Sequence, residues 1–221
     1  MAPIIGGLLA VALAAIVLAR RPRGRASRAF VAFAAAFALW NFGVYQFRAA
    51  PDADLAQRWE VAVYIALFAA PALYYHLVHA VAGVPEGRAS IVVYAGSIAA
   101  ALAAAMRFDL FVSEVRRAPE GWVPLGGPLA IVWFVFTLGV TVATFRPLVL
   151  ARRRRPPERA SRPITLLLLA TAIRLASPLV SFAGVLLVRS GVLDAALPPI
   201  VVGATLVVVC LAGVATLDTE S

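Results

Sequence analysis

The chain has 221 residues, of which 62% are hydrophobic and 14% charged. Soluble domains are about 45 to 50% apolar and about 25% charged, so this composition excludes a soluble enzyme. The formal charge of +9 at pH 7 comes from 20 basic residues, all of them arginine, against 11 acidic residues. Because a retinal Schiff base requires lysine, a retinal protein is excluded as well.

Seven apolar runs follow one another along the chain, each near the roughly 20 residues that a helix needs to cross a bilayer. Lipid offers the backbone no hydrogen-bond partner, so each run is predicted to be a helix. We predict an all-α integral membrane protein, with residues 1–221 forming one seven-helix domain and no aqueous domain. Its spans are expected at about 3–19, 29–47, 60–83, 89–106, 128–151, 163–188 and 198–217.

The arginines are distributed unevenly between the two sets of loops. Twelve lie in the loops after the first, third and fifth runs, whereas six lie in the loops on the other side, together with seven of the 11 acidic residues. The positive-inside rule then places the N-terminus outside and the C-terminus inside. We therefore expect a multi-pass protein of the bacterial inner membrane. Membrane topology explains the basic charge, so no nucleic-acid partner is expected.

The loop from about 107 to 127 is longer than the others. Its segments 111–117 and 122–125 flank Ala118-Pro119-Glu120-Gly121, which suits a type I turn. We expect a small extracytoplasmic β-hairpin between the fourth and fifth helices, with a plain loop as the alternative. Proline is tolerated in the first turn of a helix, so Pro163 and Pro198 are predicted to open the last two spans.

Several short motifs stand in a fixed order along the chain. They are Ala-Leu-Trp-Asn-Phe-Gly at 38–43, Trp59, Pro-Ala-Leu-Tyr-Tyr-His at 71–76, Gly-Trp-Val-Pro at 121–124, Gly-Pro at 127–128 and an arginine-rich loop at 152–162. In this order they resemble the N-terminal seven-transmembrane sensor region of bacterial histidine kinases. The resemblance implies a dimeric sensor of a ligand or envelope state in a two-component system, which relays its signal to a cytoplasmic output domain.

The sequence departs from that family after the seventh run. It ends at Ser221 and contains neither a phosphoacceptor helix nor an ATP-binding module. We therefore expect either a truncated sensor or a stand-alone relative that signals through a separate protein.

Arg174 lies near the middle of the sixth run, where a guanidinium is costly to bury. Thr171, Ser177 and Ser181 share its helix face by spacing, and Pro178 removes the amide that would bond the Arg174 carbonyl. Two roles remain open for Arg174. It either locks helices together through freed carbonyls or Asn41, or it anchors an anionic small molecule or lipid.

A second group of polar and aromatic residues gathers where the second and third spans approach the outer side. These residues form an aromatic belt at the interface or line an outward-facing pocket. Together with the sixth span they give the candidate ligand-binding set of Trp40, Asn41, Tyr45, Trp59, Glu60, Tyr64, Arg174, Ser177 and Ser181.

His76 and His79 lie three residues apart on the inner half of the third span. A metal site needs at least one further ligand at that depth, and none is apparent, so no metal is expected. Structural hydrogen bonding between helices and a proton-linked switch remain the two interpretations.

The sequence holds no catalytic motif, so neither an enzyme nor a cofactor is expected. We predict a membrane sensor or signal-transducing domain, with the bilayer and a second copy or another membrane or cytoplasmic protein as partners. The alternative is a non-catalytic accessory or assembly subunit of a larger membrane complex, for which the alanine-rich helix faces are suited.

Overall fold

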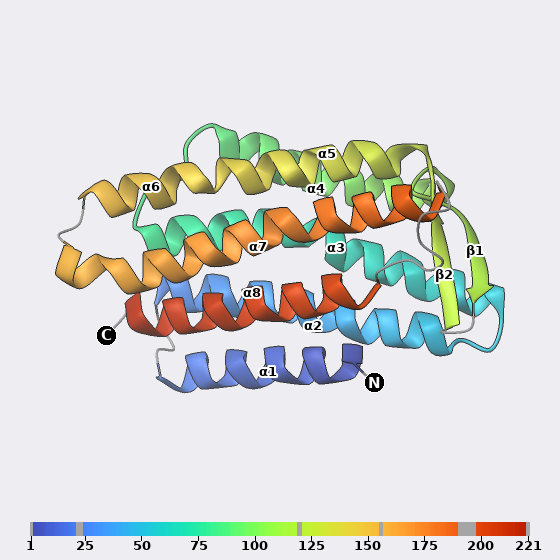
Figure 1. Cartoon of the computed structure of the whole chain (residues 1–221), viewed down its shortest axis with the longest axis horizontal. Helices are drawn as coiled ribbons and strands as arrows, with labels where there is room; N and C mark the ends of the chain where they lie inside the picture. The colour runs from blue at the N-terminus through green and yellow to red at the C-terminus, as the bar shows by residue number, and fades with distance from the viewer. Residues whose placement is uncertain (1, 21–23, 119–120, 155–156, 190–197, 220–221) are drawn as a thin grey trace.

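The computed structural model describes residues 2–20, 24–118, 121–154, 157–189 and 198–219. The fold is mostly helical, with the long helices side by side and a small β-hairpin across one end (Figure 1). In chain order the elements are α1 (Ala2–Arg20), α2 (Arg25–Ala49), α3 (Ala53–Ala82), α4 (Ala89–Met106), η1 (Phe108–Leu110), β1 (Val112–Ala118), β2 (Gly121–Gly126), α5 (Pro128–Ala143), α6 (Phe145–Arg154), α7 (Pro157–Arg189) and α8 (Pro198–Thr219).

Helices occupy each of the seven predicted runs. Within the described residues, five stretches are long and apolar enough to cross a membrane: Pro3–Arg20, Arg25–Ala49, Ala53–Ala82, Ala89–Met106 and Pro128–Arg154. Helices α7 and α8 run alongside them (Figure 1). The prediction of a helical membrane protein is therefore confirmed in its general form.

Helix α3 is longer than predicted, because it begins at Ala53 and not near residue 60. The side chain of Asp52 caps its first turn by accepting a hydrogen bond from the Leu55 amide at 2.8 Å. Its end agrees with the prediction, since Gly83 adopts the left-handed conformation that terminates helices. The resulting rod of 30 residues extends beyond a single bilayer core.

Of the two prolines predicted to open spans, Pro198 begins α8 as predicted and Pro163 does not begin α7. Pro157, and not Pro163, is the first residue of α7, so Pro163 lies inside the helix. The predicted fifth span is divided at Thr144 into α5 and α6. Pro147 explains this break, because it has no amide to donate to the Ala143 carbonyl one turn earlier.

The main hydrophobic core joins α1, α2, α3, α6, α7 and α8. Its largest buried side chains include Phe30, Phe33, Tyr74, Leu77 and Leu167. A separate aromatic cluster lies toward the hairpin, between α3, α4, η1 and α5, and consists of Tyr64, Phe68, Phe108, Phe111, Trp133 and Phe136.

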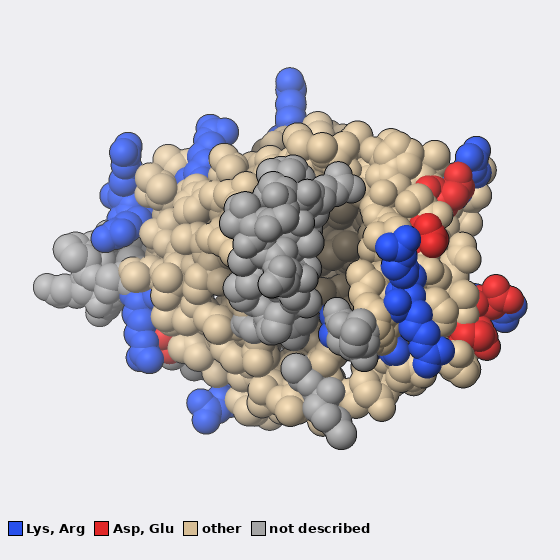
Figure 2. Space-filling view, turned by 45° about the vertical axis from the view of Figure 1, so that its right-hand side comes forward, with Lys and Arg blue, Asp and Glu red and all other residues tan. Residues whose placement is uncertain are grey.

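Apolar side chains also cover much of the outer surface. Helices α1, α4 and α5 expose large ones, including Leu8, Ile91, Leu102, Met106 and Val135. Figure 2 shows a broad uncharged surface between the charged groups, with acidic side chains gathered toward the hairpin end and mainly arginine at the opposite edge. Such a belt is the surface that a bilayer core covers.

The predicted hairpin is present, as β1 and β2 pair antiparallel from Val112 with Gly126 to Ala118 with Gly121. Its predicted turn residues Pro119 and Glu120 lie outside the described residues. The hairpin is fixed to the α2–α3 connection, because the Trp122 indole donates a 2.8 Å hydrogen bond to the Ala50 carbonyl. Trp122 and Val115 also pack on Phe47 and neighbouring residues of α2 and α3.

Candidate functional site

A charged cluster joins three helices at the end of the bundle opposite the hairpin. It consists of Arg25 at the start of α2, His76 on α3, Glu86 in the α3–α4 loop and Tyr94 on α4. We call it the Glu86 cluster. The α3–α4 loop starts at Gly83, which ends α3. Pro85, whose ring fixes its own φ, restricts the backbone directly before Glu86.

The Glu86 carboxylate is the centre of this cluster, and its side chain is only 14% exposed. One oxygen lies 2.6 Å from His76 Nδ1 and 3.1 Å from Arg25 Nη2. The other accepts a 2.9 Å hydrogen bond from the Tyr94 hydroxyl. His76 Nδ1 also lies 3.0 Å from the Tyr94 hydroxyl, so His76, Tyr94 and Glu86 form one polar network.

The shared carboxylate ties three helices together at this end of the bundle. Arg25 of α2, His76 of α3 and Tyr94 of α4 all contact Glu86 in the α3–α4 loop. The proton-linked interpretation of His76 stays a prediction.

His79 has different surroundings from His76. It is buried, its Nδ1 donates to the Tyr75 carbonyl at 3.0 Å, and the rings of His79 and Tyr75 lie 4.2 Å apart. No group of three or more potential metal ligands occurs within the described ranges.

Arg174 lies against an aromatic ring, because its guanidinium carbon is 5.0 Å from the ring centroid of Tyr74 on α3. The Tyr74 hydroxyl is hydrogen bonded to Thr171 Oγ1 at 2.8 Å, and Thr171 in turn donates to the Leu167 carbonyl. Arg174 Nε is buried and has no hydrogen-bond partner among the residues that the structure describes. This cation–π contact joins α3 and α7.

Asn41 does not act as the partner of Arg174. Its amide nitrogen donates to the Phe37 carbonyl at 2.9 Å, and within the described ranges its buried Oδ1 accepts no hydrogen bond. Asn41 instead faces α1, where a Cβ added to Gly6 would lie 3.0 Å from Oδ1.

The remaining candidates of the outer group lie on different sides of α2 and α3. Trp40 contacts Phe37 beside the main core, and Trp59 contacts Phe42 near the hairpin. Tyr64 belongs to the aromatic cluster and contacts Phe108, so it is separated from Asn41, which faces α1.

Helices α2 and α3 touch directly between these candidates, since a Cβ on Gly43 would lie 2.7 Å from Val63 Cγ2. Glu60 is 3% exposed and interacts electrostatically with Arg48, and Tyr45 is half-buried. The side chains of Ser177 and Ser181 lie outside the described part of the chain.

Sequence reasoning missed Glu86, Tyr94 and Tyr74. Glu86 lies in a loop, and its approach to His76 depends on how sharply the chain turns after Gly83. The available signal for this contact was the position of the carboxylate. Glu86 follows His76 by ten residues and comes just after a helix-ending glycine and a proline. Tyr74 was read only as part of a family motif, although it supplies the ring against which Arg174 packs.

Comparisons with protein-family models, curated proteins and solved structures find no match to this chain. The arguments about function therefore rest on the residues and contacts described above.

We expect Arg174→Met to leave thermal stability in detergent nearly unchanged. The cation–π contact is worth up to about 2 kcal/mol when desolvated, but the substitution also removes a charge that is costly to bury. Thermal unfolding of purified protein measures the balance. Tyr74→Phe, which keeps the ring and loses only the bond to Thr171, should cost about 1 kcal/mol. A much larger loss for Arg174→Met than for Tyr74→Phe would make Arg174 a structural residue and would count against an anchoring role.

Proposed function

We propose that the chain is a seven-span signal-transducing domain of the bacterial inner membrane, with its N-terminus outside, its C-terminus inside and a homodimeric assembly. The observation that supports this function best is that the single helix α3 contacts the hairpin near one end and the Glu86 cluster near the other. At one end, Ala56 and Trp59 of α3 pack with Val115 and Trp122 of the hairpin. At the other end, His76 of α3 enters the Glu86 cluster.

A rod of this kind can carry a displacement across the bilayer. A change that moves the hairpin also moves the first turns of α3, and the Glu86 cluster responds at the far end. A ligand or envelope state shifts such an equilibrium only by its differential affinity for the two positions. The inner ends of α7 and α8 are the proposed exit for the signal, since Arg162 Nε lies 3.2 Å from Asp218 Oδ2 and joins them.

The orientation predicts opposite labelling of two engineered cysteines. Ser113 lies exposed on β1, and Arg153 lies exposed near the end of α6. In a Cys210→Ser background, Ser113→Cys should react with a membrane-impermeant maleimide in intact cells, and Arg153→Cys only after lysis. Labelling of both from the same side would contradict the proposed topology.

The signalling role predicts that disturbing the hairpin changes the opposite end of the bundle. Spin labels are placed at Gly87→Cys and Arg153→Cys in the Cys210→Ser background, and their distance distribution is measured in nanodiscs. Trp122→Ala removes the anchor to Ala50 and should shift or broaden that distribution. Glu114→Ala, on the exposed part of β1, is the matched control and should not.

An unchanged distribution with Trp122→Ala would mean that the hairpin and the inner end are not coupled. The chain would then fit a passive scaffold, and the accessory or assembly subunit would become the better proposal.

A further inference from the structure

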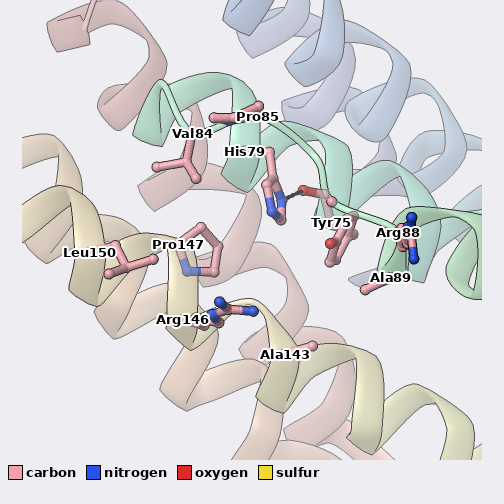
Figure 3. A pocket seen from close by; sticks show the side chains of 11 residues that line it. Tyr75, His79, Val84, Pro85, Arg88, Ala89, Ala143, Arg146, Pro147 and Leu150 are labelled. Atoms are coloured by element: carbon pink, nitrogen blue, oxygen red, sulfur yellow. Dashed lines mark hydrogen bonds between the residues drawn. The ribbon is translucent and has the colours of Figure 1, made fainter.

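A cavity of about 430 Å³ lies between the end of α3, the α3–α4 loop and the α5–α6 break. It is at the same end of the bundle as the Glu86 cluster, and Pro85 and Gly87, the two neighbours of Glu86 in the chain, line it. Figure 3 shows Tyr75 and His79 on one wall and Arg146 and Pro147 on the other, with Arg88 at the side.

The cavity has a positive lining. Arg88 and Arg146 come from separate elements, and among the described lining residues there is no carboxylate. Neither guanidinium has a carboxylate partner within the described part of the chain. The nearest acid of the loop, Glu86, is already occupied by Arg25 and His76.

The polar groups of the other wall suit the same kind of ligand. His79 donates through Nδ1 to the Tyr75 carbonyl, so its Nε2 is left for another group. The phenolic hydroxyl of Tyr75 interacts electrostatically with Glu86 and, more weakly, with Arg146. A phosphate group offers oxygens to both guanidinium groups, and the Tyr75 hydroxyl can donate a hydrogen bond to a phosphate oxygen.

The remaining walls are apolar, with Val84, Ala143, Pro147 and Leu150 among them. The cavity also lies where the apolar belt gives way to arginine-rich loops. Basic pockets between membrane helices at this level are suited to lipid headgroups, with acyl chains continuing along the apolar surface.

From this geometry we propose that the cavity between Arg88 and Arg146 binds a phosphate group, presented by an anionic phospholipid headgroup or by a soluble phosphate ester. The site does not depend on the signalling role, since it requires only that this end of the bundle meets a phosphate-bearing molecule.

The test uses the full chain in detergent and a fluorescent phosphatidylglycerol as the probe, with fluorescent phosphatidylcholine for comparison. Arg88→Gln and Arg146→Gln should each weaken phosphatidylglycerol binding about tenfold, because each removes a charge-assisted hydrogen bond to the bound phosphate. Arg153→Gln is the matched control, because Arg153 is exposed on the same helix as Arg146 and does not line the cavity. It should change the affinity less than twofold.

Competition distinguishes the two sources of phosphate. Displacement of the probe by unlabelled phosphatidylglycerol but not by glycerol 3-phosphate identifies a lipid headgroup, whereas displacement by glycerol 3-phosphate identifies a soluble ester. An equal loss of affinity with Arg153→Gln would overturn the proposal, because the attraction would then be unspecific. Equal binding of phosphatidylcholine and phosphatidylglycerol would overturn it as well.

A second variant keeps the proposal testable if the arginine variants fold poorly. Ala143→Leu fills part of the cavity without changing charge, and it should also weaken phosphatidylglycerol binding. Full retention of binding with Ala143→Leu would place the phosphate outside this cavity and overturn the proposal.

Discussion

Gly121→Ala is expected to detach the hairpin from the α2–α3 connection. Gly121 has φ of 115°, a conformation that residues with a Cβ rarely adopt, and an added Cβ would lie 2.6 Å from the Arg48 carbonyl oxygen. Backbone strain of this kind costs about 1 to 3 kcal/mol, and the overlap with a backbone atom adds a comparable amount. Hydrogen exchange of residues 112–126 should increase markedly, and Trp122 fluorescence should shift toward that of a solvent-exposed indole.

Gly139→Ala is the matched control for this prediction. Gly139 lies in α5 with open space around its Cα and ordinary helical geometry. Alanine there should be neutral or stabilise the helix by up to about 1 kcal/mol. Unchanged hydrogen exchange of the hairpin in Gly121→Ala would show that its docking does not depend on this close approach.

Glu86→Ala is expected to lower the free energy of unfolding by about 1 to 3 kcal/mol. The substitution leaves the half-buried His76 and Tyr94 with only their 3.0 Å contact to each other, whereas Arg25 is 57% exposed and regains water. Glu86→Gln retains an acceptor for Tyr94 and should show a smaller loss. Thermal unfolding in detergent at neutral pH measures both.

Glu114→Ala, which changes charge on the exposed part of the hairpin, should leave the unfolding temperature within the error of the wild type. If Glu86→Ala behaves in the same way, the cluster contributes neither to helix packing nor to the proposed coupling through α3.

The sequence predicted the helical fold well because apolar runs in a membrane have few alternatives. It predicted helix ends less well, because these depend on single residues whose effect is decided locally. Asp52 extends α3 outward by capping it, and Pro147 divides the fifth run, while Pro163 is accommodated inside α7. Each of these residues can be picked out in the sequence, but its sequence neighbours do not determine whether it starts a helix, divides one or is accommodated inside one.

The candidate site was predicted less completely than the fold. Periodicity indicated which residues share a helix face but not which helix that face meets. Asn41, one of the two partners considered for Arg174, faces Gly6 of α1, whereas Arg174 faces Tyr74 of α3. His76 was named a candidate from the sequence, whereas its acid partner Glu86 comes from a loop for which no periodicity exists.

The packing of α1 against α8 has a consequence for biogenesis. Ala10 and Val17 of α1 belong to the same core as Val209 and Ala212 of α8, almost the whole length of the sequence away. During synthesis α1 can pair with α2 early, but its second neighbour emerges only after every intervening helix has been made. Long-range contacts of this kind form slowly because much chain must be ordered first. The side of α1 that packs on α8 is therefore exposed to lipid or to an insertion factor until α8 has been synthesised. Substitutions on that side should reduce the yield of assembled protein more than they reduce the stability of the finished bundle.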